Sequence, residues 1–238
     1  MHEEHRTRLR ERFMNEGLDG FAPHNVLELL LFYSIPRRDT NETAHRLLDK
    51  FGSLSAVFEA DIDDLTKVDG IGTNSAVLLK LISQTARRYM TEKQSEKKIL
   101  DTAKLIAEYL VPRFIGETVE RVYLLLLNSS YQILGCELVF TGSVNSSHIQ
   151  TRDLIERALS LKATMAVLAH NHPGGIAVPS GEDIATTKHI YEAFNIVNVR
   201  LIEHFVIAED KYTPIIIKSL LSLCQFTGDE ERRRFYSE

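Results

Sequence analysis

Residues 168–183 read LAHNHPGGIAVPSGED, the most informative pattern in this chain. It overlaps a short apolar run, residues 163–170, whose length and composition predict a buried strand. His170 and His172 stand at the end of that run, and a glycine-rich loop follows them. Side chains two residues apart on a strand point to the same face, so the two imidazoles are placed to hold one metal ion.

A carboxylate completes a candidate metal site. Asp183 comes eleven residues after His172, at the start of a predicted helix over residues 181–195. Two histidines and one carboxylate leave the fourth position of a tetrahedral zinc open for water, which is typical of catalytic zinc. Zinc lowers the pKa of its water from about 16 toward about 7, and a nearby carboxylate can accept the released proton.

A plainer interpretation of the same residues stays open. Ser180 and Asp183 have the spacing of a helix capping box, in which the serine caps the helix and the acid bonds back to it. In that case Asp183 is only a helix-start residue, and the residues before it form an ordinary turn-rich loop. The two roles compete for the oxygens of Asp183.

Composition limits the classes of protein to consider. The 238 residues suffice for one large domain or two small ones, and 44% apolar with 26% charged residues is typical of a globular protein. A net charge of −5 gives no overall attraction to nucleic acid, and Cys136 and Cys224 are too far apart to suggest a cysteine-rich zinc module. The first residues show no apolar segment typical of a signal peptide, and the apolar run 26–35 is too short to span a membrane. We therefore expect a cytoplasmic protein with no membrane partner.

The chain changes character near residue 100. Residues 1–92 contain helical patterns and no convincing strand, and we interpret the polar stretch 93–103 as a linker. The helical segments are predicted over residues 24–35, 40–52, 53–60, 61–68 and 74–90.

The remainder predicts a mixed α/β domain over residues 104–228, followed by a charged, solvated tail over 229–238. After a helix over 102–114, two strands form an apparent hairpin, and strands then alternate with helices in the order β-β-α-β-α-β. The predicted strands are residues 121–130, 132–142, 163–170 and 199–208, with a further strand suggested at 212–217.

The spacing of His170, His172, Ser180 and Asp183 resembles the signature of the JAMM (JAB/MPN+) metalloproteases. HNHPGG followed by PSGEDI looks more narrowly like the RadC family, and the resemblance covers nearly the whole chain. Gly174 stands where that family usually has serine, and residues 151–153 read Thr-Arg-Asp in place of Pro-Arg-Glu. The resemblance implies a mixed-sheet, layered fold like that of cytidine deaminases, preceded by an all-helical domain.

The resemblance also implies roles for residues. His170, His172 and Asp183 would bind Zn²⁺, and the Ser180 hydroxyl would help to hold the oxyanion of the tetrahedral intermediate. An upstream glutamate would be the general base, which favours Glu120 and leaves Glu137 as the alternative.

Three further histidines are weaker candidates for a role in the metal site. His204 lies in an apolar strand, where a buried core histidine is commoner than a metal ligand. It can still orient a metal ligand by a hydrogen bond without binding the metal itself. His148 and His189 look like surface residues.

A second motif lies in the helical half. Residues 67–72, KVDGIG, have helical patterns on each side and resemble the turn of a helix-hairpin-helix. Gly70 and Gly72 permit a tight turn, whose N–H groups can hold a DNA phosphate with Lys67 nearby. The same hairpin also serves as a simple packing element, and the basic segment 6–12 is equally a solvated helix face.

Three functions remain open. The first is a zinc-dependent hydrolase that cleaves an amide bond of an unidentified peptide or protein, as a peptidase or isopeptidase. The second is a DNA-associated repair or recombination factor that binds DNA through the hairpin without cleaving peptides. The third is an interaction module in which the metal is structural or absent, and the intact ligand set argues against it.

Overall fold

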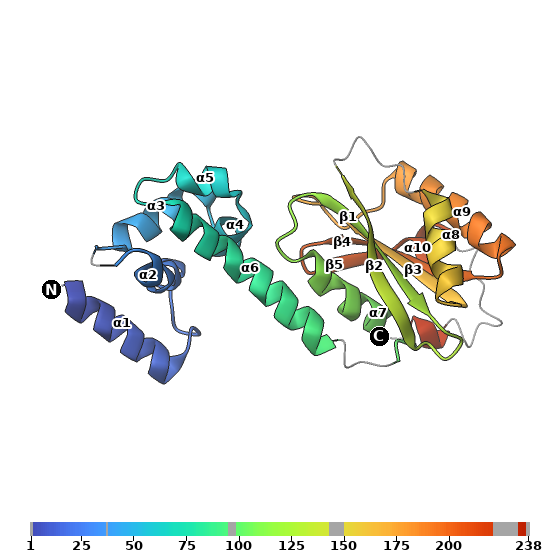
Figure 1. The fold of residues 1–238 in the computed structure, drawn as a ribbon, viewed down its shortest axis with the longest axis horizontal. Coiled ribbons are helices and arrows are strands. Elements are labelled where there is room, and N and C mark those ends of the chain that lie inside the picture. The colour runs from blue at the N-terminus through green and yellow to red at the C-terminus, as the bar shows by residue number, and fades with distance from the viewer. Residues whose placement is uncertain (1, 37, 95–98, 143–149, 221–232, 237–238) are drawn as a thin grey trace. The chain divides into compact units, whose positions relative to one another are not determined.

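The structure, a computed structural model, describes residues 2–36, 38–94, 99–142, 150–220 and 233–236 (Figure 1). The chain divides into two compact units, Met1–Ala86 and Arg87–Glu238, each with its own apolar core. The division falls inside the long helix α6, and the units are described separately.

The described part of the first unit is helical, as predicted. Ser53 caps α4 by accepting a hydrogen bond from the Ala56 N–H, and Gly52 ends α3 with a φ of 86°. Apolar residues of α2 to α6, such as Leu27, Leu47 and Leu79, are fully buried together. The helices are α1 (His2–Glu16), α2 (Pro23–Ser34), α3 (Asn41–Phe51), α4 (Leu54–Glu59), α5 (Ile62–Thr66) and α6 (Thr73–Gln94).

The second unit is built on a mixed five-stranded sheet, which confirms the predicted fold class. The strand order is β2-β1-β3-β4-β5, in which β3 and β4 run parallel and the other neighbours are antiparallel. The strands are β1 (Glu120–Leu127), β2 (Ile133–Gly142), β3 (Met165–Asn171), β4 (Arg200–Ala208) and β5 (Lys211–Pro214).

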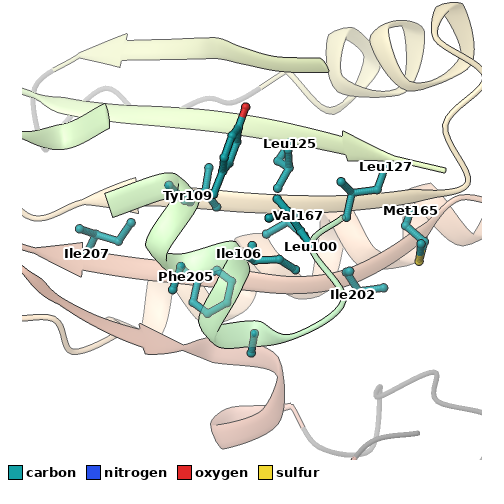
Figure 2. Packing of buried hydrophobic residues seen from close by; sticks show 14 of the residues in the cluster. Leu100, Ile106, Tyr109, Leu125, Leu127, Met165, Val167, Ile202, Phe205 and Ile207 are labelled. Atoms are coloured by element: carbon teal, nitrogen blue, oxygen red, sulfur yellow. The ribbon is translucent and has the colours of Figure 1, made fainter. Parts of the chain in front are cut away.

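Helices cover both faces of this sheet. Alternate residues of a strand face opposite sides, so Val167 and Ala169 of β3 join one apolar cluster while Ala166 and Leu168 join the other. Figure 2 shows the first cluster, in which Ile106 lies against the sheet. The helical segments are α7 (Ala103–Leu110), the 3₁₀ turn η1 (Val111–Phe114), α8 (Thr151–Ser160), α9 (Gly181–Ile196) and α10 (Ile215–Ser219).

The layer opposite α7 positions the site. Helices α8 and α9 pack on the face that carries Leu168, and α9 is the connection between the parallel strands β3 and β4 (Figure 1). The start of α9 therefore follows directly from the end of β3 through the loop over residues 172–180.

The structure differs from the sequence-based expectation at the C-terminal end of the sheet. The strand suggested at 212–217 ends at Pro214, and the chain continues as α10. The reason is a buried carboxylate: Glu203 of β4 accepts hydrogen bonds from the N–H groups of Ile216 and Ile217 and so fixes the helix start.

The segments interpreted as a linker and as a solvated tail also contribute to the core. Leu100, in the stretch interpreted as a linker, is fully buried, and its N–H donates to the Tyr131 carbonyl. Phe235, in the expected tail, is 1% exposed. Both are apolar residues within polar stretches, and both belong to the apolar cluster that also contains residues of α7.

The cysteines and the apolar helices can be compared with the expectations from sequence. Cys136 is a free thiol, and Cys224 lies outside the described residues. In the part of the chain that the structure describes, no helix has the length and apolar character required to cross a bilayer.

Candidate metal centre

Three side chains meet where β3 ends and α9 begins. Nε2 of His170 lies 3.1 Å from Nε2 of His172, and it lies 3.2 Å from Oδ1 of Asp183. His172 Nε2 lies 3.5 Å from Asp183 Oδ2. The three predicted ligands thus converge, each offering one donor atom to a common point.

The donor set fits a metal cation. The Nδ1 atom of His172 lies 3.1 Å from the Ile176 carbonyl, which can only accept, so Nδ1 carries the ring proton of neutral His172. Its Nε2 lone pair then faces a second imidazole nitrogen and a carboxylate. Such an arrangement is repulsive unless a positive charge lies between the groups, either a metal ion or, without one, a proton shared with Asp183. Two imidazoles with one carboxylate are ligands that zinc accepts.

The helix cap at Asp183 leaves one carboxylate oxygen for the candidate metal position. The capping box is present: the Asp183 N–H donates to the Ser180 hydroxyl, and Asp183 Oδ2 accepts from the N–H and hydroxyl of Ser180. Asp183 Oδ1 is the oxygen nearest His170. The cap and the metal position therefore use different oxygens.

The charges of the site shift the pKa values of two groups. Burial disfavours ionisation of Asp183, but the hydrogen bonds that His170 and His172 donate when they are protonated, together with the hydrogen bond from Ser180, outweigh it and hold the pKa of Asp183 well below its usual range. The hydrogen bond with Asp183 raises the pKa of His172 against the effect of its partial burial. The carboxylate is thus ionised and available as a ligand at any physiological pH.

A buried histidine lies directly behind the ligands. Nε2 of His204, on β4, lies 2.8 Å from Nδ1 of His170, and its Nδ1 lies 2.6 Å from the hydroxyl of Thr187 on α9. Burial, together with the neighbouring His170, holds the pKa of His204 well below its usual value. His204 therefore contacts a ligand without belonging to the ligand group. His189 is exposed, as expected, and His148 lies outside the described residues.

The ligands open into a cavity of about 490 Å³. Both predicted catalytic residues, Glu120 at the start of β1 and Ser180, line it. The exposed side chains of Ile176 and Val178 form an apolar part of its wall. Glu137, the alternative base, instead forms an ion pair with Arg157 of α8 and does not line this cavity.

Asn171, between the two histidines, fixes the backbone on both sides of Glu120. Its Oδ1 accepts a hydrogen bond of 2.7 Å from the Arg121 N–H, and its Nδ2 donates to the Val119 carbonyl at 3.1 Å. The strand register pairs Val122 with His170, so the next same-face residue of β1, Glu120, comes beside His172.

Sequence reasoning missed two residues of this centre, Thr187 and Asn171. Thr187 has a signal, because it lies four residues after Asp183 and so on the same face of a helix. Asn171 lies on the opposite face of β3 from the histidines, and its role depends on a contact with β1 that no local pattern encodes.

The predicted nucleic-acid residues lie together in the first unit. Gly70 has a φ of 92°, and a Cβ there would come 2.7 Å from the Thr43 hydroxyl oxygen, so the turn requires glycine. Gly72 lies before α6 with open space around it. Both line a hollow of about 480 Å³ with Arg38, while Lys67 forms an ion pair with Asp64.

Comparison with known proteins agrees with this description. The RadC-like JAB domain matches residues 100–219, and the UPF0758 N-terminal domain matches residues 2–77. This chain belongs to the RadC-like family. A UPF0758 protein of Fusobacterium nucleatum is 36% identical over 224 residues, covering 91% of this chain and 97% of the relative. A second, from Methylibium petroleiphilum, is 31% identical over 214 residues, covering 90% and 96%.

One departure from the RadC pattern has a local physical reason. Gly174, which stands where the family usually has serine, has a φ of 66°, and a Cβ there would meet nothing within 4 Å. Glycine adopts this left-handed conformation without the penalty that an L side chain pays. In this RadC-like chain the substitution eases the turn between His172 and Asp183 and leaves the ligand set intact.

Proposed function

We propose that this RadC-like protein is a zinc-dependent metallohydrolase that cleaves an amide bond in a peptide or protein. The observation that carries the proposal is the convergence of His170, His172 and Asp183 at a cavity that Glu120 also lines. Three ligands leave one zinc position open, as hydrolytic zinc sites do. A zinc ion held by these residues would supply a nucleophilic water near neutral pH and polarise the substrate carbonyl.

The chain's own residues would handle the protons and the developing charge. Glu120 lines the cavity on the same face as the ligands and would accept a proton and pass it to the leaving amine. The Ser180 hydroxyl now donates to Asp183 Oδ2, and by rotating it would donate to the oxyanion of the carbonyl. The apolar wall at Ile176 and Val178 would exclude water and contact the substrate.

The test compares two glutamates. We expect purified wild-type protein to contain about one zinc per chain, and His172→Ala and Asp183→Ala to lose it. Glu120→Gln should keep its zinc and lose hydrolysis of a fluorogenic peptide-amide library, whereas Glu137→Gln, the matched control, should keep both. Turnover by Glu120→Gln at the wild-type rate would refute the assignment of the base, and a wild-type protein that binds no zinc would refute the metal site.

A second candidate function is DNA binding through the hairpin of the first unit. The observation that favours it is the hollow at the start of α6, lined by Arg38, Gly70 and Gly72. The first N–H groups of a helix have no partner within the helix, so they and an arginine suit a phosphate.

Fluorescence anisotropy with labelled duplex and branched DNA tests this function. We expect salt-sensitive binding that Arg38→Gln weakens and that Lys67→Gln weakens less, because Asp64 already pairs with Lys67. Absence of binding at low ionic strength would exclude the function.

A further inference from the structure

A continuous chain of hydrogen bonds runs behind the ligands, and its direction is set by a group that can only accept. The Thr187 hydroxyl lies 2.6 Å from the backbone carbonyl of Asp183 and 2.6 Å from Nδ1 of His204. A carbonyl has no proton to give, so the single hydroxyl proton of Thr187 points to Asp183. The hydroxyl oxygen then accepts from His204, whose Nδ1 must carry the proton.

The same reasoning extends to the ligand itself. A neutral imidazole has one N–H, so His204 with a proton on Nδ1 has a lone pair on Nε2. This lone pair lies 2.8 Å from Nδ1 of His170, which must therefore donate. The proton of His170 is thereby held on Nδ1, and the lone pair of its Nε2 faces His172 and Asp183.

The two histidine ligands reach the same tautomer by different means. His172 is oriented directly by the Ile176 carbonyl. His170 is buried, and its Nδ1 meets an imidazole, which can either accept or donate. The choice between these two directions depends on Thr187, which lies across the His204 ring from His170.

We propose that Thr187 and His204 are positioning residues that hold His170 in the tautomer able to bind metal. This inference deepens the proposed function and rests on its metal site. The relay joins three elements, since Thr187 comes from α9, His204 from β4 and His170 from β3. Partners behind a metal ligand fix its ring and its tautomer, and their loss typically weakens metal binding about 10- to 100-fold.

The experiment removes one hydroxyl that touches no ligand side chain. Thr187→Val has nearly the same shape as the wild type and leaves Nδ1 of His204 without its acceptor. His204 can then carry its proton on Nε2 and donate it to Nδ1 of His170, which reverses the hydrogen bond between the two rings. Thr187→Ser keeps the hydroxyl and is the matched control. Two quantities are measured: the ¹⁵N chemical shifts of the His170 ring in metal-free protein, which report its tautomer, and Zn²⁺ affinity by competition with a chelator.

In the wild type and Thr187→Ser we expect neutral His170 to carry its proton on Nδ1. In Thr187→Val we expect a substantial population with the proton on Nε2 and a loss of Zn²⁺ affinity of about 10- to 100-fold. Thermal unfolding of the three metal-free proteins checks that the variants are folded.

Several results would overturn the relay: a wild-type His170 with its proton on Nε2, a tautomer unchanged in Thr187→Val, an altered tautomer with unchanged Zn²⁺ affinity, or a Thr187→Ser that behaves like Thr187→Val. Failure of the proposed function is distinguishable from these results. If the wild type binds no zinc, the metal site is wrong, while the metal-free spectra still decide whether the relay exists.

Discussion

Asp183 divides its carboxylate between a helix cap and a metal position. Oδ2 accepts two hydrogen bonds from Ser180, and Oδ1 is the nearer oxygen to His170. The cap restricts rotation of the carboxylate and so aims the second oxygen. The sequence left open whether Asp183 caps a helix or binds metal. The structure shows the cap, and the cap holds Oδ1 in a position suited to the proposed metal.

Ser180 allows capping and catalysis to be separated. Ser180→Ala should lower the free energy of unfolding by about 1 kcal/mol, because alanine is a poor N-cap, whereas Ser180→Gly should cost only a few tenths. Both variants lack the hydroxyl, and in the proposed mechanism both should lose about 100- to 1,000-fold in kcat while keeping zinc. Urea unfolding, zinc content and peptide hydrolysis measure the three quantities. Wild-type kcat in Ser180→Gly would show that the hydroxyl acts only as a cap.

At the scale of elements, the start of β1 decides where Glu120 lies. Asn171 replaces part of the strand ladder there with two side-chain hydrogen bonds. At the other end of the same strand, Asn128 accepts hydrogen bonds from the N–H groups of Ser130 and Gln132 and so holds the turn. Both asparagines bind backbone N–H groups at an end of β1, but only Asn171 lies near the cavity.

These two positions form a matched pair of variants. We expect Asn171→Ala to lower the free energy of unfolding by about 1–3 kcal/mol, because it leaves backbone groups of Val119 and Arg121 without their partner. It should also lower the rate of peptide hydrolysis with zinc affinity unchanged, since Glu120 moves and the ligands do not. Asn128→Ala should lose less stability in chemical denaturation, because its hydrogen bonds are exposed and water can replace them, and it should keep its rate. Equal rates in the two variants would contradict the role given to Asn171.

The elements themselves were largely predictable, because the signals that define them are local. Alternating and continuous apolar runs located β1 to β4, and the spacing of the histidines and Asp183 located the three side chains that converge. The end of β5 was not predictable in this way: Ile215 and Ile216 suit a strand as well as a helix, and the choice is made by Glu203 from another element. Asn171 was missed for the same reason, since it acts on residues of β1 that are distant in sequence. Thr187 had a local signal in its spacing from Asp183, but its contact with His204 did not.

At the scale of the whole second unit, Glu203 joins the sheet to the C-terminal segment. It is fully buried, and besides binding α10 it accepts hydrogen bonds from the His204 N–H and the Tyr236 hydroxyl. Burial raises the pKa of Glu203 to about 7, although the hydrogen bonds from Tyr236 and the backbone oppose the shift. Its usual pKa is 4.5.

This shift predicts a dependence of stability on pH. An acid whose pKa is higher in the folded than in the unfolded state binds more protons when folded, so stability falls as pH rises between the two values. We expect the free energy of unfolding to lose about 3 kcal/mol from this group between about pH 4.5 and 7. Glu203→Gln should flatten that part of the profile, measured by urea unfolding of metal-free protein. A variant profile parallel to that of the wild type would contradict the prediction.

The ligands and the proposed base come from different parts of the chain, and this has a consequence for folding. The ligands, Thr187 and His204 all lie in the single crossover β3–α9–β4, whereas Glu120 is supplied by the antiparallel neighbour β1. A short crossover closes its contacts at low entropic cost, so its ligands can gather before β1 is paired. A slip of β1 by one residue would turn Glu120 to the opposite face of the sheet and leave the crossover unchanged. Such a misfolded chain would still capture zinc but would be inert, so metal content alone would not reveal whether a preparation had reached its native register.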